Sequence, residues 1–346
     1  MKHQTTRYGE IPFYKIGTFG NTADAFISKK LFLEYKTKYS FPKKGDILIS
    51  ASGTIGRAVI YDGKPAYFQD SNIVWIDNDE TLVKNDFLFY AYSNVKWNTE
   101  YTTILRLYND NFRNTLIPLP PLNEQIAIAN ILSGLDRYLC TLDALILKKE
   151  GVKKSLSFEL LSQKKRLKGF NQAWQRVRLG DIANYLTSNL SAEQITQQGK
   201  IKVYDVNNFI GYTDTTFISD KSYISIVKDG SVGRVRILPP KTNILSTMGA
   251  LIANHRTTTE FLFYLLSNFD FKNFTSGSII PHIYFKDYKE KTIFLPPLNE
   301  QSAIANILSG LDNEITSLKN KKRQFENIKK ALNHDLMSAK IRVLKK

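Results

Sequence analysis

The stretch LPPLNEQIAIANILSGLD at residues 119–136 returns almost unchanged as LPPLNEQSAIANILSGLD at residues 295–312. The two copies differ only at Ile126 and Ser302. Each begins with a proline pair, which cannot continue a strand or lie inside a helix, and goes on into a long periodic apolar run. This is the pattern of a helix start. The second copy lies 176 residues after the first, so the sequence predicts a duplicated unit and two domains rather than a solenoid.

The polar residues of the repeat suit the first turn of a helix. Asn123 and Asn299 can accept free backbone N–H groups. Glu124 and Glu300 place negative charge at the positive end of the helix dipole.

Apolar residues continue at spacings of three and four beyond both copies, which favours a coiled-coil seam. The predicted seam positions, which would also carry partner subunits, are Leu132, Leu135, Leu139, Leu142, Leu308, Leu311, Ile315 and Leu318. A helix from residue 122 to residue 161 would span roughly 60 Å. Lysines on seam positions would weaken the zipper: Lys149, Lys153, Lys322 and Lys329. The alternative is two amphipathic helices, each packed on its own domain.

Composition indicates a soluble globular protein with a polyanionic partner. The 346 residues carry a formal charge of +16, with a pI of about 9.6 and 42% hydrophobic residues. No apolar run is long enough for a membrane span, and MKHQTTRYGE lacks a signal-peptide core. The single cysteine, Cys140, allows neither an intrachain disulfide nor a cysteine zinc site, so a reducing compartment is expected. A merely basic soluble protein is the alternative.

The sequence therefore predicts an α+β fold with an internal repeat. Two β-rich domains, 1–118 and 170–294, each precede a long helix, at 119–169 and 295–346. Gly169 is the expected stop of the first helix. The clearest strand predictions are 47–50, 57–61, 71–76, 201–204, 223–226, 234–238 and 243–246. Short helices are expected at 86–93 and 260–267, and residues 174–186 are expected to form an opening strand that runs into a short helix.

One turn keeps its register in both β-rich domains. SGTIGR at residues 52–57 matches DGSVGR at residues 229–234, at an offset of 177. Two glycines three residues apart, with a hydroxyl and a trailing arginine, make a tight turn that can expose N–H groups to a phosphate. An ordinary hairpin turn needs the same glycines.

Catalytic templates are missing. The sequence has no Gly-x-x-x-x-Gly-Lys-Ser/Thr loop, no His-Glu-x-x-His, no paired cysteine ligands and no Asn/Asp-Pro-Pro-aromatic motif of amino-group methyltransferases. An enzyme with an unrecognised nuclease or transferase site stays an alternative. Metal-dependent DNA cleavage would support it.

Residues suited to DNA are better supplied. Cations in predicted turns or at strand ends are Lys43, Lys44, Arg57, Arg106, Lys228, Arg234, Arg236 and Arg256. Hydrogen-bonding side chains of the kind that read base edges or phosphates are Ser52, Thr54, Gln69, Asn72, Asn109, Ser231, Thr247, Ser276, Ser278 and His282. For each of these residues, a solvated surface position is the simple alternative.

Taken together, these motifs resemble the specificity subunit of type I restriction-modification enzymes. The resemblance is carried by the doubled LPPLNEQ helix start, by WQRVRLGDI at residues 174–182 and by KDGSVGR at residues 228–234. KKGDILIS followed by GTIG, at residues 43–56, is similar to that family's target-recognition domain. The resemblance covers almost the whole chain.

The resemblance implies a non-catalytic DNA reader in the bacterial or archaeal cytoplasm. Two target-recognition domains would sit at opposite ends of an antiparallel helix pair, and each would read half of an interrupted double-stranded DNA site. The helices would set a spacing of under two duplex turns of roughly 34–36 Å each. Two adenine methyltransferase subunits would dock on the helices, and endonuclease/translocase subunits would join them. S-adenosylmethionine, ATP and Mg would bind in those partners, with no cofactor or metal in this chain.

One departure concerns the first domain. The offset of 176 residues would place its counterpart of Trp174 before Met1, so a shortened opening of the first domain is expected. The other open interpretation of the whole chain is a free-standing DNA-binding adaptor or regulator that dimerises through its long helices. Such an adaptor would have no affinity for a methyltransferase.

Overall fold

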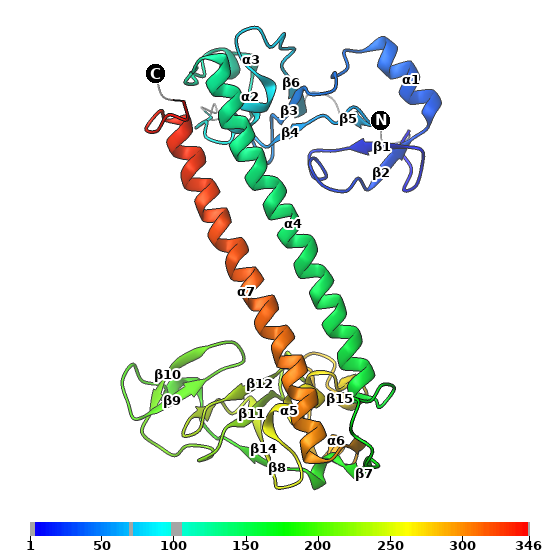
Figure 1. Ribbon diagram of the computed structural model, residues 1–346, viewed down its shortest axis with the longest axis vertical. Coiled ribbons are helices and arrows are strands. Elements are labelled where there is room, and N and C mark those ends of the chain that lie inside the picture. The colour runs from blue at the N-terminus through cyan, green and yellow to red at the C-terminus, as the bar shows by residue number, and fades with distance from the viewer. Residues whose placement is uncertain (1–3, 69–71, 98–105, 345–346) are drawn as a thin grey trace. The chain divides into compact units, whose positions relative to one another are not determined.

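The computed structural model describes residues 4–68, 72–97 and 106–344. The chain divides into two compact units (Figure 1). Unit 1 comprises Met1–Asp143 and Asn320–Lys346, and unit 2 comprises Ala144–Lys319. Each unit contains one β-rich module together with a part of each long helix. The predicted α+β class, with a long helix after each β-rich module, is confirmed.

Unit 1 is built on two three-stranded sheets, in the orders β2-β1-β5 and β4-β3-β6. Its strands are β1 (Ile11–Tyr14), β2 (Ala25–Ile27), β3 (Ile47–Ser50), β4 (Ala58–Ile60), β5 (Tyr67–Phe68) and β6 (Ile73–Trp75). Its short helices are α1 (Lys29–Lys38), α2 (Asn85–Tyr92) and α3 (Asn109–Arg113). The first long helix, α4 (Leu122–Leu161), starts in this unit.

Unit 2 has a three-stranded sheet β10-β9-β13, a four-stranded sheet β12-β11-β14-β8, and the pairs β15-β16 and β17-β7. The strands up to the middle of the unit are β7 (Gln175–Arg178), β8 (Ala183–Thr187), β9 (Ile201–Tyr204), β10 (Phe209–Thr213) and β11 (Tyr223–Val227). The later strands are β12 (Val235–Leu238), β13 (Asn243–Ile244), β14 (Met248–Ala253), β15 (Thr275–Ser276), β16 (His282–Ile283) and β17 (Thr292–Leu295). The α-helices are α5 (Thr259–Ser267), α6 (Phe285–Tyr288) and the start of α7 (Leu298–Met337). Turns of 3-10 helix occupy Leu179–Asp181, Ala192–Gln194 and Lys272–Phe274.

The two β-rich modules share one topology. β3 lies between β4 and β6 as β11 lies between β12 and β14, with antiparallel pairing throughout. β1 pairs in parallel with β5, and β9 pairs in parallel with β13. The internal repeat of the sequence is therefore a repeat of structure. The pairing of β8 with β14 and of β7 with β17 is described only in unit 2.

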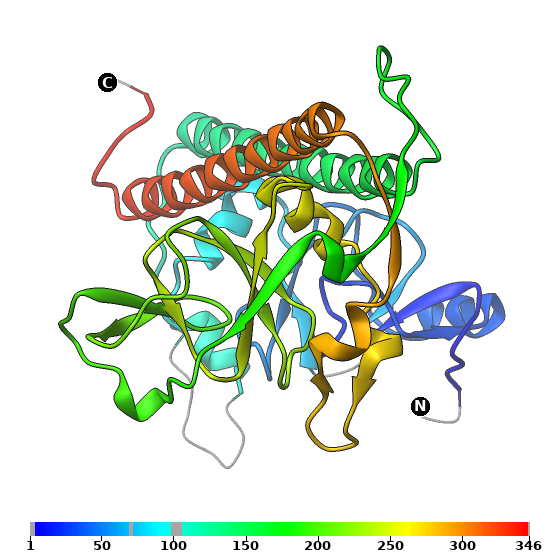
Figure 2. The same ribbon diagram turned by 90° about the horizontal axis from the view of Figure 1, so that it is seen from below.

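Inside each unit, the parts of α4 and α7 pack antiparallel (Figures 1 and 2). Glu124, at the start of α4, binds Arg342 beyond the end of α7, whereas Arg166, beyond the end of α4, binds Glu300 at the start of α7. The seam residues Leu132, Leu142, Leu308 and Ile315 are buried, and Leu135, Leu139, Leu311 and Leu318 are half-buried.

The four seam lysines do not interrupt this packing, because each meets a carboxylate of the facing helix. The pairs are Lys149 with Glu314, Lys153 with Asp312, Lys322 with Asp143, and Lys329 with Asp136. In unit 1, Tyr138 and Phe325 face each other with their ring centroids 4.7 Å apart. The corresponding positions in unit 2 are those of Glu314 and Lys149. Charge pairs and aromatic contact thus replace leucine on part of the seam.

Two expectations need correction. α4 ends at Leu161, well before Gly169, and Gln163 adopts a positive φ of 61° just after it. The chain turns there, and the Arg166 guanidinium binds Glu300 and the Gln172 carbonyl (2.8 Å). The second expectation is wrong only in part. β7 does run into a short helix, the 3-10 turn Leu179–Asp181, but Ala183–Thr187 is the strand β8, because all five of its residues pair with β14.

Candidate nucleic-acid interface

The glutamine of each repeat fixes a β-rich module to its long helix. Gln301 is fully buried, and its Oε1 accepts hydrogen bonds from the Thr257 hydroxyl (2.9 Å) and the Thr258 N–H (3.0 Å). Its Nε2 donates to the carbonyls of Arg256 (2.9 Å) and Pro296 (2.8 Å). Because Thr258 is the N-cap of α5, the glutamine anchors the start of that helix.

Gln125 makes the same joint in unit 1. Its Oε1 accepts from the Lys84 N–H at 2.8 Å, and its Nε2 donates to the carbonyls of Leu82 (3.0 Å) and Pro120 (2.8 Å). Lys84 is the N-cap residue of α2. The repeated motif is therefore a structural connector between helix and module.

The glutamate of each repeat completes the joint. The Arg166 guanidinium donates to both oxygens of Glu300 (2.7 and 3.2 Å), and Trp174 Nε1 donates to Glu300 at 2.9 Å. In unit 1, Arg342 donates to both oxygens of Glu124, and these hydrogen bonds lower the pKa of that carboxyl. Asn123 and Asn299 accept the next residue's N–H at 2.9 Å in both copies.

A tyrosine, an aspartate and a lysine form a second contact between module and helices. Asp312 accepts from the Tyr264 hydroxyl (2.9 Å) and binds Lys153. The pKa of Tyr264 is raised, mainly because the hydroxyl is buried and secondly because of this hydrogen bond. The equivalent residues in unit 1 are Tyr90, Asp136 and Lys329, where the hydroxyl lies 2.7 Å from the carboxylate.

Both glycine turns have the tight geometry that the sequence predicts. Gly53, Gly56, Gly230 and Gly233 all have φ between +67° and +83°. A Cβ on Gly56 would lie 2.2 Å from Trp97 Nε1, and a Cβ on Gly233 would lie 2.6 Å from the Phe271 ring. Glycine is thus required both by backbone conformation and by the packed aromatic ring.

In unit 2 the turn is held beside two other segments. The Lys228 N–H donates to the Thr247 carbonyl (3.1 Å), and the Ile283 N–H donates to the Lys228 carbonyl (2.9 Å). The Nδ1 of His282 lies 2.7 Å from Asp229 Oδ1, and Ser276 pairs with His282 across the β15-β16 hairpin, which is drawn in gold in Figure 2. The structure therefore gathers six predicted residues, the unit 2 cluster: Lys228, Ser231, Thr247, Ser276, Ser278 and His282.

Unit 1 repeats this arrangement with other side chains. The Ala51 N–H donates to the Asn72 carbonyl (2.8 Å), and the Leu107 N–H donates to the Ala51 carbonyl (2.8 Å). Ser52 bridges to Arg106 as Asp229 bridges to His282, and the Ser52 hydroxyl donates to Asn72 Oδ1 at 3.0 Å. The unit 1 cluster is Ser52, Thr54, Asn72 and Arg106, with Asn109 three residues further on at the start of α3. Asn72 thus corresponds to Thr247, and Arg106 to His282.

The remaining predicted residues lie elsewhere or support the turn. Lys43 and Lys44 precede β3, at the opposite end of that strand from the turn, and Asp77 raises the pKa of Lys43 by hydrogen bonding. Arg57 donates to the Phe19 carbonyl (2.9 Å), while Arg256 lies at the α7 joint, 3.2 Å from Gln175 Oε1. Gln69 lies outside the described residues.

Two features near the unit 2 cluster were not predicted. Asn207 lies in the β9-β10 loop. Its side-chain oxygen accepts a hydrogen bond from Arg234 (2.8 Å), and its carbonyl accepts one from Arg236 (2.9 Å). Ile279, in the loop between β15 and β16, is 92% exposed. The pair of isoleucines between Gly277 and Pro281 was the available signal, because the flanking glycine and proline mark a surface loop.

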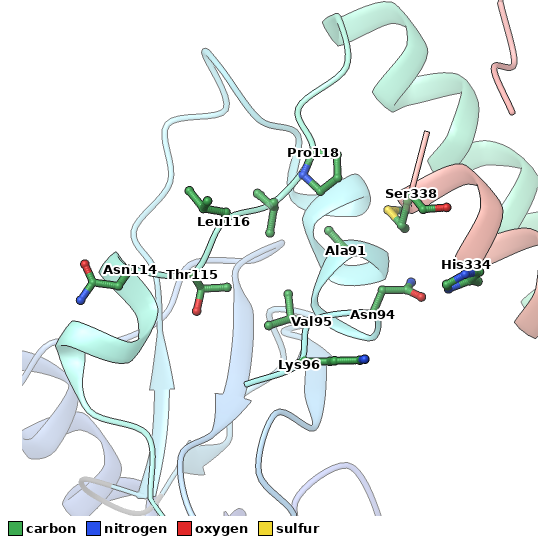
Figure 3. Close-up of a pocket in the computed structure, with 12 residues that line it drawn as sticks. Ala91, Asn94, Val95, Lys96, Asn114, Thr115, Leu116, Pro118, His334 and Ser338 are labelled. Atoms are coloured by element: carbon green, nitrogen blue, oxygen red, sulfur yellow. The ribbon is translucent and has the colours of Figure 1, made fainter. Parts of the chain in front are cut away.

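Two cavities occupy equivalent places in the two units, between the β-rich module and the end of a long helix. In unit 1 a cavity of about 450 Å³ is bounded by Ala91 and Val95 of the module and by His334 and Ser338 of the α7 end (Figure 3). In unit 2 a cavity of about 420 Å³ is bounded by Leu265, Phe158 and Ser162 among others. Within the described ranges, no group of His, Cys, Asp or Glu is placed to hold a metal ion. No helix in the described part of the chain could cross a membrane.

Two β-rich modules of one topology, each fixed by the same joint to a long helix, define a class of internally duplicated α+β proteins. The chain belongs to the family of type I restriction modification DNA specificity domains, which matches residues 1–166 and 171–327. Members of this family are specificity subunits rather than catalytic subunits, as the sequence motifs predict.

Relatives and solved structures agree with this assignment. The putative type I restriction enzyme MjaX specificity subunit of Methanocaldococcus jannaschii is 30% identical over 335 residues, which are 86% of this chain and 79% of that protein. A putative type I specificity subunit of Haemophilus influenzae is 65% identical over 133 residues, but these span only 38% of this chain and about a third (34%) of that relative. The fold matches the type I S subunit from M. genitalium with a TM-score of 0.64 at 20% identity, covering 97% and 91% of the two chains.

Proposed function

We propose that the two modules read the two halves of an interrupted double-stranded DNA site. The observation that carries this proposal is the equivalence of the two clusters. Each places a glycine turn, the polar residue just before the neighbouring strand and one side chain of a third segment together, with the same pattern of backbone hydrogen bonds but different side chains. The backbone of the two clusters is arranged in the same way, whereas their side chains differ. This is the combination expected of two modules that bind half-sites of different sequence.

Within each cluster we assign different tasks to the turn and to the neighbouring side chains. The Lys228 side chain contacts a phosphate, which sets the register on the duplex. Most N–H groups of the turn do not take part, because they donate to carbonyls within the protein, as Gly230 does to Pro281 and Gly233 to Val227. Asn72 and Arg106 in unit 1, and Thr247 and His282 in unit 2, face base edges. Domain boundaries at residues 118, 169 and 294 separate these modules from the helices.

The long helices carry the partner subunits in this proposal. One related structure is described as a type I R-M system undergoing complex assembly, and it matches this fold with a TM-score of 0.53 at 15% identity. By analogy, two adenine methyltransferase subunits dock on α4 and α7, and endonuclease/translocase subunits join them in the prokaryotic cytoplasm. S-adenosylmethionine, ATP and Mg bind in those subunits, where a flipped adenine is methylated.

The test is co-expression with the neighbouring methyltransferase subunit, followed by mapping of methylated adenines across the host genome by single-molecule sequencing. A two-part motif with a fixed gap is expected, and His282→Ala is expected to relax one half of it only. Methyl transfer by the purified chain alone would contradict the proposal. A stable homodimer without affinity for the methyltransferase would instead favour an adaptor.

A further inference from the structure

The arginine after each glycine turn binds a loop of its own module. Arg234 donates a hydrogen bond to the Asn207 side chain at 2.8 Å, and its counterpart Arg57 donates to the Phe19 carbonyl at 2.9 Å. Asn207 lies in the β9-β10 loop, and Phe19 lies in the β1-β2 loop. These loops correspond, because β9 and β10 pair in unit 2 as β1 and β2 pair in unit 1. In both units, therefore, this arginine holds the same hairpin loop.

The residue two positions after each arginine supports the same loop, since alternate residues of a strand share a face. Arg236 donates to the Asn207 carbonyl at 2.9 Å, and its guanidinium lies 5.3 Å from the centre of the Tyr204 ring. The same position in unit 1 is Val59, which packs against the buried cluster that contains Phe19. Different side chains thus make one contact between the loop and the strand that follows the turn.

Each loop also lies beside the glycine turn of its cluster. In unit 1, a Cβ on Gly53 of the turn would lie 3.3 Å from Ile16 Cγ1 in the β1-β2 loop. In unit 2, Arg234 directly follows the last glycine of the turn, and its side chain reaches the β9-β10 loop. The turn of unit 2 therefore has two neighbouring loops, because the Gly230 N–H also donates to the Pro281 carbonyl of the β15-β16 hairpin at 2.9 Å.

Both loops present an exposed asparagine. Asn208 in unit 2 and Asn21 in unit 1 are exposed, and neither side chain makes a hydrogen bond to a described residue. The backbone beside Asn208 is fixed, because Asp205 Oδ1 accepts the N–H groups of Asn207 (2.8 Å) and Asn208 (2.6 Å). An asparagine amide carries a donor and an acceptor, and a base edge in the major groove can pair with both.

We propose that this hairpin loop is an additional DNA-reading segment of each module, and that the arginine after the glycine turn is a positioning residue that holds the loop beside the cluster. The inference rests on the proposed function, in which the modules read DNA half-sites. Asn208 and Asn21 contact base edges next to those that the clusters meet. Arg57 and Arg234 act through the loop, because their guanidinium groups bind it instead of a phosphate.

The test uses the complex of the full chain with the methyltransferase subunit, and maps methylated adenines for each variant. Asn208→Ala is expected to relax one base pair of one half-site about tenfold, which is about 1.4 kcal/mol, at a position that His282→Ala leaves unchanged. Asn21→Ala is expected to relax one base pair of the other half-site. Asn184→Ala is the matched control and is expected to keep the whole motif. Asn184 is exposed on β8 opposite Ile252, at the end of β14 that is remote from the turn.

The salt dependence of DNA binding by the complex separates positioning by Arg234 from a direct phosphate contact. Arg234→Gln and Asn207→Ala are both expected to relax the base pair that Asn208→Ala relaxes, without a change in the slope of log K against log salt. Loss of a phosphate contact would instead reduce the magnitude of that slope by about 0.9, as expected for Lys228→Gln. Because Asn207→Ala keeps the charge of Arg234, this variant tests the placement of the loop alone.

Two results would overturn the inference and leave the proposed function in place. One is an intact motif in the Asn208→Ala complex. The other is a slope change of about 0.9 for Arg234→Gln together with an unchanged motif for Asn207→Ala. A wild-type complex that methylates no two-part motif would overturn the proposed function itself, and this inference with it.

Discussion

The two buried glutamines, Gln125 and Gln301, show how much one side chain of the repeat contributes. Gln301→Leu leaves the Thr258 N–H and the Arg256 and Pro296 carbonyls without their partner. We expect the free energy of unfolding of unit 2 to fall by at least about 3 kcal/mol, since three buried groups lose their partner and each unsatisfied group costs about 1–3 kcal/mol. Urea denaturation measures the change. Gln198→Leu, at an exposed position, is the control, and an equal effect of both variants would contradict the prediction.

The ion pair of Glu124 with Arg342 predicts a dependence of stability on pH. The hydrogen bonds from Arg342 lower the pKa of Glu124 in the folded state. A lowered folded pKa stabilises the fold above the unfolded value of about 4.3, and this stabilisation is lost as the pH falls through the folded pKa. Glu124→Gln is therefore expected to reduce the acid-side slope of stability in urea titrations at several pH values. Glu34→Gln, an exposed change, serves as control. Identical slopes in all three proteins would refute the expectation.

Lys228 and His282 lie in one cluster, but they are expected to differ in their effect on DNA binding. Lys228→Gln removes a phosphate contact, so affinity should fall for all sequences and the slope of log K against log salt should change by about 0.9. His282→Ala should relax specificity at one base position by about 1–3 kcal/mol. Titrations of matched and mismatched duplexes over a salt series separate the two effects. Equal behaviour of both variants would argue against this division of tasks.

The sequence identified most members of the two clusters but not their proximity. Hydroxyl, amide and cationic residues in predicted turns are recognisable by type, and the glycine turn kept its register. Thr247 and His282 come together only through strand pairings of long sequence separation, which local patterns do not encode. Local patterns also did not separate Lys43 from Arg57. Both are cations in predicted turns, although they lie at opposite ends of β3.

At the scale of elements, the contact of α5 with the long helices depends on the Asp312 carboxylate, which binds two side chains at once. Asp312 accepts from Tyr264 and binds Lys153, so Tyr264→Phe and Lys153→Met are expected to be coupled by about 0.5–3 kcal/mol. A double-mutant cycle in urea measures this coupling. Tyr264→Phe with Lys319→Met is the control cycle, because Lys319 binds Glu150 instead. Additive effects in the first cycle would contradict the prediction.

Strong local patterns predicted the elements well. The strands β3 and β9, both rich in β-branched residues, have the bounds that the sequence indicates. The segment ANYLT at residues 183–187 mixes the strand formers Tyr185 and Thr187 with residues that are rare in strands, and its strand depends on pairing with β14. The short helix expected up to residue 186 is therefore limited to the 3-10 turn Leu179–Asp181. α1 was missed because its charged sequence, KKLFLEYKTK, buries only Phe32 and has little periodicity.

At the scale of the whole molecule, the two units differ in how the chain builds them. Unit 2 is one continuous stretch, whereas unit 1 needs both Met1–Asp143 and Asn320–Lys346. A fragment of residues 144–319 is therefore expected to fold alone, with a cooperative thermal transition in circular dichroism. The fragment of residues 1–143 is expected to lack such a transition, because Leu336 and Met337 of the missing stretch belong to its core. A disordered 144–319 fragment would refute this expectation.

The joint made by Gln125 and Gln301 has a consequence for how such proteins diversify. Both side chains bind mainly main-chain groups of the attached module, which every sequence carries apart from the N–H of proline. A module of different sequence can therefore be attached without compensating changes in the helix. New DNA preferences can then arise when genes exchange whole modules between lineages, while the assembly that uses them stays the same.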